Sequence, residues 1–220
     1  MSTDQYDYNA DDEFRHFIRW AADHKLNMIK TKEIVFHRPR FDTGLVPGLL
    51  DGVERVHSAK LLGVMLTDSL HFTSHVDNLV TVINQRLFLL SRLRKMGLDI
   101  AGLNTVFQAI VVGKVLYALP ALFGFYSQSE IDRINNVLRK AFRWGLTNKC
   151  YDVQDLADSA DEQLFLGITS IPGHCLTQLL PELRPVVYDL RPRGHPYKLP
   201  KIKQDYFRSC YINRMLFKLL

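Results

Sequence analysis

An almost uncharged run, AIVVGKVLYALPALFGFY between Ala109 and Tyr126, limits the folds open to this chain more than any other feature. Its length is close to the roughly 20 residues that a membrane-spanning helix needs. Two residues argue against a span: a central lysine, Lys114, costs about 2.5–3.5 kcal/mol on insertion scales, and Pro120 breaks the helix near its middle. The run therefore predicts a buried helix followed by an apolar turn, and no membrane partner.

The rest of the composition is that of an intracellular globular chain. Of the 220 residues 47% are hydrophobic, which is enough to bury a core. Cys150, Cys175 and Cys210 are odd in number and widely spaced, so they predict reduced thiols rather than a disulfide framework or a zinc site. The first 13 residues, MSTDQYDYNADDE, have no apolar stretch of the kind found in secretory signals. We therefore expect a cytoplasmic or nuclear protein that is not secreted.

Charge is distributed in blocks. Residues 14–150 hold nineteen Lys and Arg against ten Asp and Glu, a net charge of +9, and residues 184–220 hold nine against two, a net charge of +7. Residues 1–13 and 151–165 each carry −5. Two basic blocks separated by an acidic block favour a polyanionic partner, although ordinary solvated surface would also account for them.

The hydrophobic spacing predicts an α+β fold that is mostly α. Acids at positions 11–13 open a helix that runs to residue 26, with Phe14, Phe17, Ile18 and Ala21 at helical spacing. A strand follows over residues 32–37, and residues 53–72 form strands around Gly63.

From about Ser74 the period changes to 3.6 residues, and Gly97 stands where a helix-ending glycine is expected. Further helices are expected over about 102–118, over 129–144 with Ser127 or Ser129 as the N-cap, and, shorter, over 152–166. Residues after Pro172 are irregular up to a last amphipathic stretch, YFRSCYINRMLFKLL. The residues expected to be buried in the bundle are Leu79, Ile83, Leu87, Leu90, Phe107, Ile110, Ile134 and Leu138.

Several short sequence motifs occur in a defined order along the chain. A Trp20-containing helix is followed by NxxKTKE at Asn27 to Glu33, the strand IVFH, KLLGV at residues 60–64, and then NQRLFLLSRLRKMGL, FQAIVVGKVLYAL and RINNVLRKAFRWG. This ordered set, with the basic end LRPRGHPYKLP, resembles the region downstream of the active site in LINE-type non-LTR retrotransposon reverse transcriptases. The resemblance implies an end-of-palm remnant with a primer-grip hairpin (residues 1–72), a three-helix thumb (73–150), and a short helix with a Pro-rich basic segment (151–220).

The resemblance also implies that the chain alone does not polymerise. Family members hold two Mg²⁺ ions with carboxylates that lie upstream of the Trp helix, the nearest in a Tyr-x-Asp-Asp turn. Here Tyr8-Asn9-Ala10-Asp11-Asp12 imitates that turn by composition only, because its spacing is off by one and no apolar strand precedes it. We therefore expect a fragment of an RNA-directed DNA polymerase with no catalytic residues, no metal site and no cofactor of its own.

By resemblance, Lys30 and Lys32 occupy the pyrophosphate-side motif, and Leu62, Gly63 and Val64 occupy the primer grip. Cations on the thumb helices and on the tail could bind RNA or an RNA–DNA hybrid weakly and without sequence preference. Cations at the end of the first thumb helix, such as Arg92, Arg94 and Lys95, are also favoured there without any ligand. The predicted nucleic-acid-binding residues are Arg86, Arg92, Arg139, Lys140, Arg143, Arg191, Arg193, Lys198, Lys201 and Lys203.

Two other functions stay open. His75-x-Asp77 with His174 and Arg184 faintly resembles the iron and 2-oxoglutarate site of AlkB-type dioxygenases, whose metal ligands are two histidines and one carboxylate. Residues 15–66 also resemble the short N-terminal domain attributed to a tRNA-modifying AlkB homologue. The third possibility is a helical interaction protein without enzymatic activity.

Overall fold

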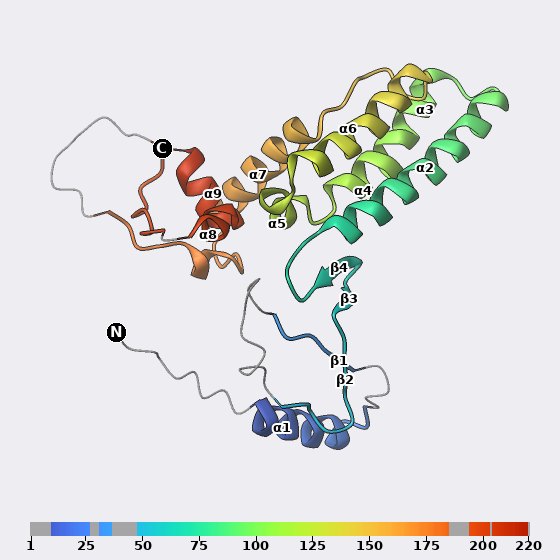
Figure 1. The fold of residues 1–220 in the computed structure, drawn as a ribbon. Coiled ribbons are helices and arrows are strands. Elements are labelled where there is room, and N and C mark those ends of the chain that lie inside the picture. Colours follow the sequence, from blue (N-terminus) through green and yellow to red (C-terminus); the bar gives the residue numbers. More distant parts are fainter. Residues whose placement is uncertain (1–9, 27–30, 37–47, 185–193, 203, 220) are drawn as a thin grey trace. The chain divides into compact units, whose positions relative to one another are not determined.

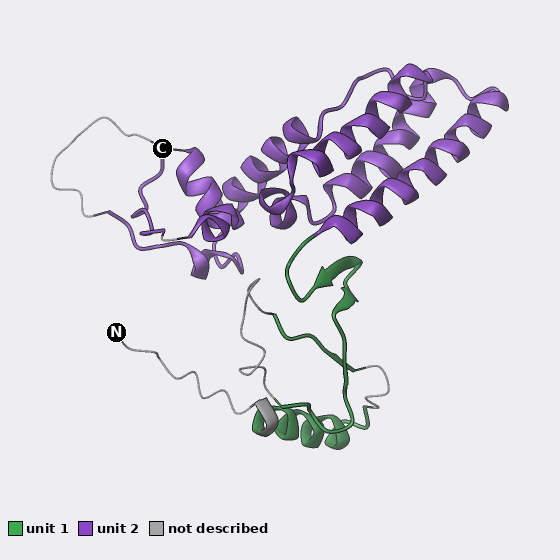
Figure 2. Ribbon diagram, viewed as in Figure 1, with its two compact units in different colours: residues 1–71 green, residues 72–220 purple. Residues whose placement is uncertain are grey.

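The computed structural model describes residues 10–26, 31–36, 48–184, 194–202 and 204–219. These residues are mostly helical and include two small two-stranded sheets, which confirms the α+β, mostly α class. The chain divides into two compact units, residues 1–71 (unit 1) and residues 72–220 (unit 2), coloured separately in Figure 2. Each unit is described by itself.

The described residues of unit 1 form one helix and four short strands. Helix α1 spans Ala10–Asp23, β1 (Lys32–Glu33) pairs in parallel with β2 (Glu54–Arg55), and β3 (Ser58–Leu61) pairs antiparallel with β4 (Val64–Thr67). Within the described part of the expected strand over residues 32–37, only Lys32 and Glu33 are paired, and His37 lies outside the described residues. Among the described hydrophobic residues of this unit, Ala21 alone is buried. Unit 1 therefore has little core of its own in the part that is described.

The hairpin predicted around Gly63 is confirmed. Leu61 pairs with Val64, so the turn consists of Leu62 and Gly63, whose φ angles are +47° and +87°. Two successive left-handed residues give the turn a backbone twist that matches the strands it joins. Glycine adopts this conformation readily, whereas the left-handed Leu62 is strained.

Unit 2 contains a bundle in which two long helices pack with a third, composite helix (Figure 1), and a further long helix follows the bundle. The long helices are α2 (Thr73–Lys95) and α6 (Gln128–Arg143). The composite helix consists of α3 (Ile100–Phe107), a π-helical turn over Gln108–Val112 and α4 (Gly113–Leu116). These are the three packed helices expected from the hydrophobic spacing, and no strand interrupts residues 73–144, all of which are described.

The core of unit 2 lies between these helices. Seven of the eight residues expected to be buried are buried, and the eighth, Ile110, is partly buried. Gly97 has a φ of +94° just after α2, as expected of a helix-ending glycine. Ser127, not Ser129, is the N-cap of α6: its hydroxyl accepts from the Glu130 N–H, and the Glu130 carboxylate accepts from the Ser127 N–H.

The apolar run folds as a buried helix followed by a turn. Residues Ile100–Phe125 are long and apolar enough to cross a membrane by length and composition. However, the backbone is extended at Tyr117 and left-handed at Ala118, so the helix ends at Leu116 and a new one, α5 (Leu119–Leu122), begins with Pro120 in its first turn. A 3₁₀ turn, η3 (Phe123–Phe125), follows. Most of the buried side chains of this run pack in the same cluster as those of α2 and α6.

The fourth helix, α7 (Val153–Ser170), is longer than α6, so the expectation of a shorter helix over 152–166 was wrong. Gly167 does not stop it, because the buried residues Phe165 and Ile168 lie on either side and anchor that turn. The helix ends at Ser170, because its C-cap Ile171 precedes Pro172 and has the extended backbone favoured at that position.

The end of the chain folds back on α7. The amphipathic stretch forms two short helices, α8 (Asp205–Ser209) and α9 (Tyr211–Lys218), with an extended ψ of 141° at Cys210 between them. Met215 and Leu216 of α9 form a small buried cluster with Phe165 of α7. Between α7 and α8 the chain forms a 3₁₀ turn, η4 (Thr177–Leu179), and an isolated bridge from Leu183 to Tyr197.

Candidate nucleic-acid interface

Helices α2 and α6 run in the same direction. At their N-termini the Thr73 hydroxyl donates to the Glu130 carboxylate at 2.7 Å. Further along, the Lys140 ammonium, from the last turn of α6, donates to the side-chain oxygen of Asn84 in the middle of α2 at 3.0 Å. Near their C-termini the Arg94 guanidinium donates to the Trp144 carbonyl. Both helices therefore end at the same end of the bundle (Figure 1).

This parallel arrangement gathers positive charge. Residues 78–98 contain four Lys and Arg, residues 133–151 contain five, and neither segment contains an Asp or Glu. Asp99, the next acid along the chain, accepts from the Gly102 N–H and caps α3. We call the cations among the last five residues of each helix the basic end: Arg92, Arg94, Lys95, Arg139, Lys140 and Arg143.

The cations of α2 are used in different ways. The predicted binding residue Arg86 donates to the carbonyl of Ile110 in the π-helical turn, so it satisfies backbone inside the bundle. Arg94 holds the C-terminus of α6 through the Trp144 carbonyl. Arg92 lies 5.1 Å from the centre of the Phe88 ring and is exposed, and Lys95 is exposed at the last residue of the helix. The helix dipole favours these cations even without a ligand.

On α6, Arg139 and Arg143 are exposed, and Arg139 lies 3.4 Å from the Asn136 side-chain oxygen. Lys140 is half-buried, because its ammonium bonds to Asn84 and lies 4.5 Å from the centre of the Trp144 ring. The predicted residues Arg92, Arg139, Lys140 and Arg143 thus lie at one end of unit 2.

The prediction from sequence missed Trp144. This residue is 47% exposed and directly follows the last residue of α6. The signal that could have found it is the phrase RKAFRW, in which aromatic residues alternate with cations at the end of a helix.

Among the motif residues of unit 1, the structure describes Lys32 and the hairpin residues Leu62, Gly63 and Val64. Lys30 lies outside the described residues, and the Lys32 ammonium pairs with the Glu54 carboxylate at 3.0 Å on an exposed surface. Leu62, at the tip of the hairpin, is 81% exposed, and Val64 is half-buried in β4. The hairpin and Lys32 line a hollow of about 690 Å³. Its lining consists of Lys32, Ile34, Phe36, Ser58, Ala59, Lys60, Leu61, Met65 and Leu66.

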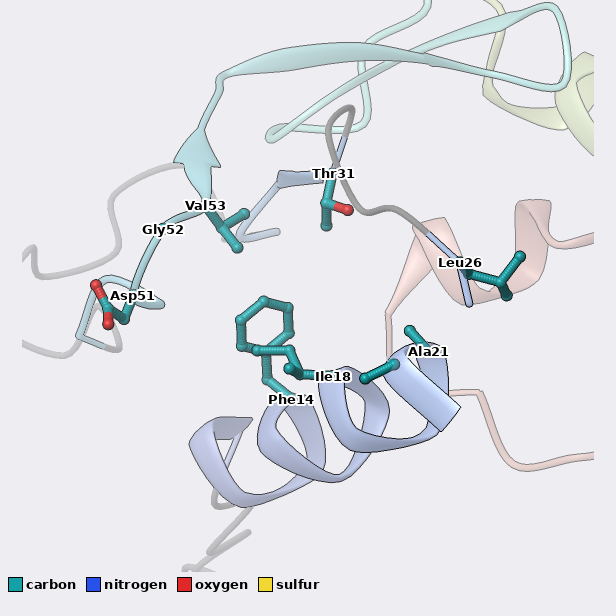
Figure 3. A pocket seen from close by; sticks show the side chains of 9 residues that line it. Phe14, Ile18, Ala21, Leu26, Thr31, Asp51, Gly52 and Val53 are labelled. Carbon is teal, nitrogen blue, oxygen red and sulfur yellow. The ribbon is translucent and has the colours of Figure 1, made fainter. Parts of the chain in front are cut away.

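A second hollow of unit 1, about 290 Å³ in volume, lies beside α1 (Figure 3). Phe14 and Ile18 of the helix face Val53 and Thr31 across it, and Asp51 lies at its edge. One hydroxyl and one carboxylate in an apolar lining do not form an acid–base pair or a metal site. This hollow reflects the loose packing of α1 rather than chemistry.

Most of the described cations of the C-terminal basic block have partners within the chain. Arg191, Arg193 and Lys203 lie outside the described residues, and the Lys198 ammonium pairs with Glu182 at 2.6 Å. Lys201 is exposed. Arg184 donates to the carbonyls of Tyr197 and His195, which keeps its charge within the loop.

The acidic block on α7 binds part of this basic block. Lys218 pairs with Asp158 at 2.7 Å and with Glu162 at 3.3 Å, and the Arg214 guanidinium holds both oxygens of Asp161 at 2.9 and 3.0 Å. Burial raises the pKa of the Asp161 carboxyl above its ordinary value, although Arg214 acts against this rise. Arg214 also donates to the carbonyls of Pro120 and Ser209.

The residues of the possible iron site have other partners. His75 is buried in the first turn of α2, where burial, followed by the nearby Lys114 charge, lowers its pKa. Asp77 pairs with Arg133, and the His174 ring accepts from the Leu176 N–H. Among the described residues no three His, Cys, Asp or Glu side chains come together in a group that could hold a metal ion.

No protein family, curated protein or solved structure matches this chain. The relation to LINE-type reverse transcriptases therefore stays a prediction that depends on the ordered motifs of the sequence.

Proposed function

We propose that unit 2 binds RNA or an RNA–DNA hybrid weakly and without sequence preference at the basic end of α2 and α6. The observation that supports this most is the parallel packing of two helices whose C-terminal halves carry cations and no acid. Such a surface attracts phosphates of any sequence, and its binding weakens as salt rises because counterions are released.

The proposal is narrower than the family resemblance. The resemblance implies a fragment of an RNA-directed DNA polymerase, and the parent family's catalytic carboxylates have no counterpart in this sequence. Asp12 lies in the first turn of α1, where it pairs with Arg15 on an exposed surface at 3.6 Å. Purified chain should therefore give no Mg²⁺-dependent primer extension on any template. Incorporation that disappears in an Asp11→Asn/Asp12→Asn variant would contradict this.

The binding test compares two triple variants of equal net charge. The first, Lys95→Glu/Arg139→Glu/Arg143→Glu, reverses three exposed cations of the basic end. The control, Lys198→Glu/Lys201→Glu/Arg208→Glu, reverses three exposed cations near the C-terminus. Because both variants change the net charge equally, any difference in affinity reports where the phosphates lie. Fluorescence anisotropy of labelled single-stranded RNA and RNA–DNA hybrid would be measured over a range of salt concentrations.

We expect the basic-end variant to weaken binding to every sequence alike. For each lost phosphate contact the slope of log K against log salt should fall by about 0.9 on a duplex and about 0.7 on a single strand. The C-terminal control should keep most of the affinity and of the slope. Equal losses in both variants, or wild-type binding that does not respond to salt, would refute the assignment to the basic end.

A further inference from the structure

A hollow of about 570 Å³ opens beside the basic end. This volume lies within the roughly 300–1,000 Å³ of pockets that take small ligands. Its lining combines an exposed tryptophan, the buried Leu146, one hydroxyl and three cations, and it contains no carboxylate. The lining residues are Ser91, Arg94, Lys95, Arg143, Trp144 and Leu146.

The backbone that carries Trp144 is held firmly. Trp144 is the C-cap that directly follows α6, and Gly145 comes next with a φ of +61°, so the chain turns away directly after Trp144. The Arg94 guanidinium donates to the Trp144 carbonyl, and a Cβ at position 145 would lie only 3.1 Å from its Nη1 atom. Glycine therefore allows both the left-handed turn and the approach of Arg94.

The ring itself is also oriented. The Lys140 ammonium lies 4.5 Å from the centre of the Trp144 ring, and the same ammonium is held by the Asn84 side chain at 3.0 Å. A cation over an indole is a favourable contact, and here its position is set by a second helix. Trp144 is therefore a flat, pre-oriented aromatic surface that is still 47% exposed.

The chemistry of the lining selects the ligand. Lys95 and Arg143 are exposed in the hollow, and no acid lies within residues 78–98 or 133–151 to neutralise them. An aromatic surface next to cations suits a strand that offers both a base face and phosphates. A fully paired duplex offers the phosphates, but its bases are stacked on one another.

We propose that this hollow takes one unpaired nucleobase, stacked on Trp144, while the adjoining phosphates bind Lys95 and Arg143. The assignment rests on the nucleic-acid binding proposed for the basic end and adds the kind of strand that is preferred: a single strand or an overhang, rather than a blunt duplex.

The two tryptophans of the chain make a direct optical test possible. Trp20→Phe leaves Trp144 as the sole indole of the 220-residue chain. In that variant, an RNA–DNA hybrid with a short single-stranded overhang should quench Trp144 fluorescence on binding. A blunt hybrid with the same number of phosphates should bind more weakly and quench little. An overhang of abasic nucleotides controls for the added phosphates and should behave like the blunt hybrid.

Two substitutions test the stacking. Trp144→Leu should weaken binding to the overhang roughly 5- to 150-fold, the range found when one base–aromatic stack is lost. It should change binding to the blunt hybrid little. Trp144→Phe keeps an aromatic ring and should retain most of the wild-type affinity for the overhang. If Trp144 contributed only apolar bulk, the Leu and Phe variants would not differ in this way. Far-UV circular dichroism would verify that both variants are folded.

Failure of this inference differs from failure of the proposed function. If Lys95→Glu/Arg139→Glu/Arg143→Glu abolishes binding but Trp144→Leu leaves the overhang preference unchanged, the stacking proposal is wrong. Nucleic-acid binding at the basic end is then still supported. If neither hybrid nor single strand binds the wild type, both proposals fail. If an acidic, tyrosine-containing peptide quenches Trp144 and the overhang does not, the hollow is a protein-binding site and the stacking proposal is again wrong.

Discussion

Two regions of unit 2 are rich in cations, but they use them in opposite ways. At the basic end of α2 and α6, Lys95, Arg139 and Arg143 are exposed and no acid lies nearby in either helix. At the docked end, where α9 packs on α7, Arg214 and Lys218 are paired with three carboxylates of α7. The net charge of a segment therefore does not tell how much of that charge is available to a partner.

The docked end explains why the acidic and basic blocks occur together in the sequence. Asp158, Asp161 and Glu162 lie within one turn of α7, and Arg214 and Lys218, four residues apart, lie on one face of α9. The blocks are therefore complementary surfaces of two packed helices. The Asp161 side chain is 2% exposed and that of Arg214 is 18% exposed, so this pair is effectively part of the core.

The largest effect is expected from breaking the buried pair. Asp161→Ala should cost about 3–5 kcal/mol of unfolding free energy, because it leaves the largely buried Arg214 guanidinium without its carboxylate. Urea denaturation would measure this loss. Lys218→Met removes an exposed cation that pairs with Asp158 and should cost no more than about 1 kcal/mol. Similar losses in the two variants would contradict the distinction between buried and exposed pairs.

A matched pair of leucines compares the two hydrophobic clusters. Leu87 and Leu216 are both fully buried, but Leu87 belongs to the large cluster and Leu216 to the small one at the docked end. Leu87→Ala should cost roughly 2–5 kcal/mol of global stability. Leu216→Ala should act mainly by local opening of α8 and α9, which amide hydrogen exchange would detect. If Leu216→Ala accelerated exchange throughout α2 and α6, the docked end would be part of the main cooperative core.

Gly124 tests how closely the end of the chain docks. A Cβ there would overlap the carbonyl oxygen of Ser209 and the guanidinium of Arg214, so Gly124→Ala should cost about 1–3 kcal/mol. Gly113→Ala is the control, because its Cβ would meet only the Gln108 carbonyl at an ordinary 3.6 Å. That substitution should stabilise α4 by up to about 1 kcal/mol. Thermal unfolding would measure the change in stability of both variants. Equal changes in the two variants would contradict the close approach at Gly124.

The smallest effect concerns the N-terminus of α6, opposite the basic end. Ser127→Ala should cost about 0.5–2 kcal/mol, because it removes the N-cap. Ser129→Ala, which loses only a bond to the Ser127 hydroxyl, should change stability by less than about 0.5 kcal/mol. Urea denaturation of the two variants would distinguish them, and a reversed order would assign the cap to Ser129.

The same cap makes stability depend on pH. Burial raises the pKa of the Glu130 carboxyl, but the hydrogen bonds from Ser127 and Thr73 outweigh it and hold the pKa below its ordinary value. Its contribution is therefore present above about pH 4.3, the ordinary glutamate value, and is lost as the pH falls through the lower folded pKa. Glu130→Gln should flatten the loss of stability on acidification, and an unchanged pH profile would contradict this.

Local patterns allowed much of unit 2 to be predicted. The spacing of Leu79, Ile83, Leu87 and Leu90 set the buried face of α2, since residues three and four apart in a helix share a face. Gly63 and Gly97 marked a hairpin and a helix end, because glycine adopts positive φ at little cost. Each of these features depends on residues a few positions apart, and the sequence by itself contains that information.

Only the tertiary structure decided which cations are available. Arg86 and Arg139 both read as exposed helix cations in sequence, yet Arg86 donates to the Ile110 carbonyl and Arg139 is exposed at the basic end. The partners that matter are far apart along the chain: 50 positions separate Arg94 from Trp144, and 53 separate Asp161 from Arg214. Helical periodicity carries no information over such distances, because the direction and contact of two helices are set by how their side chains pack.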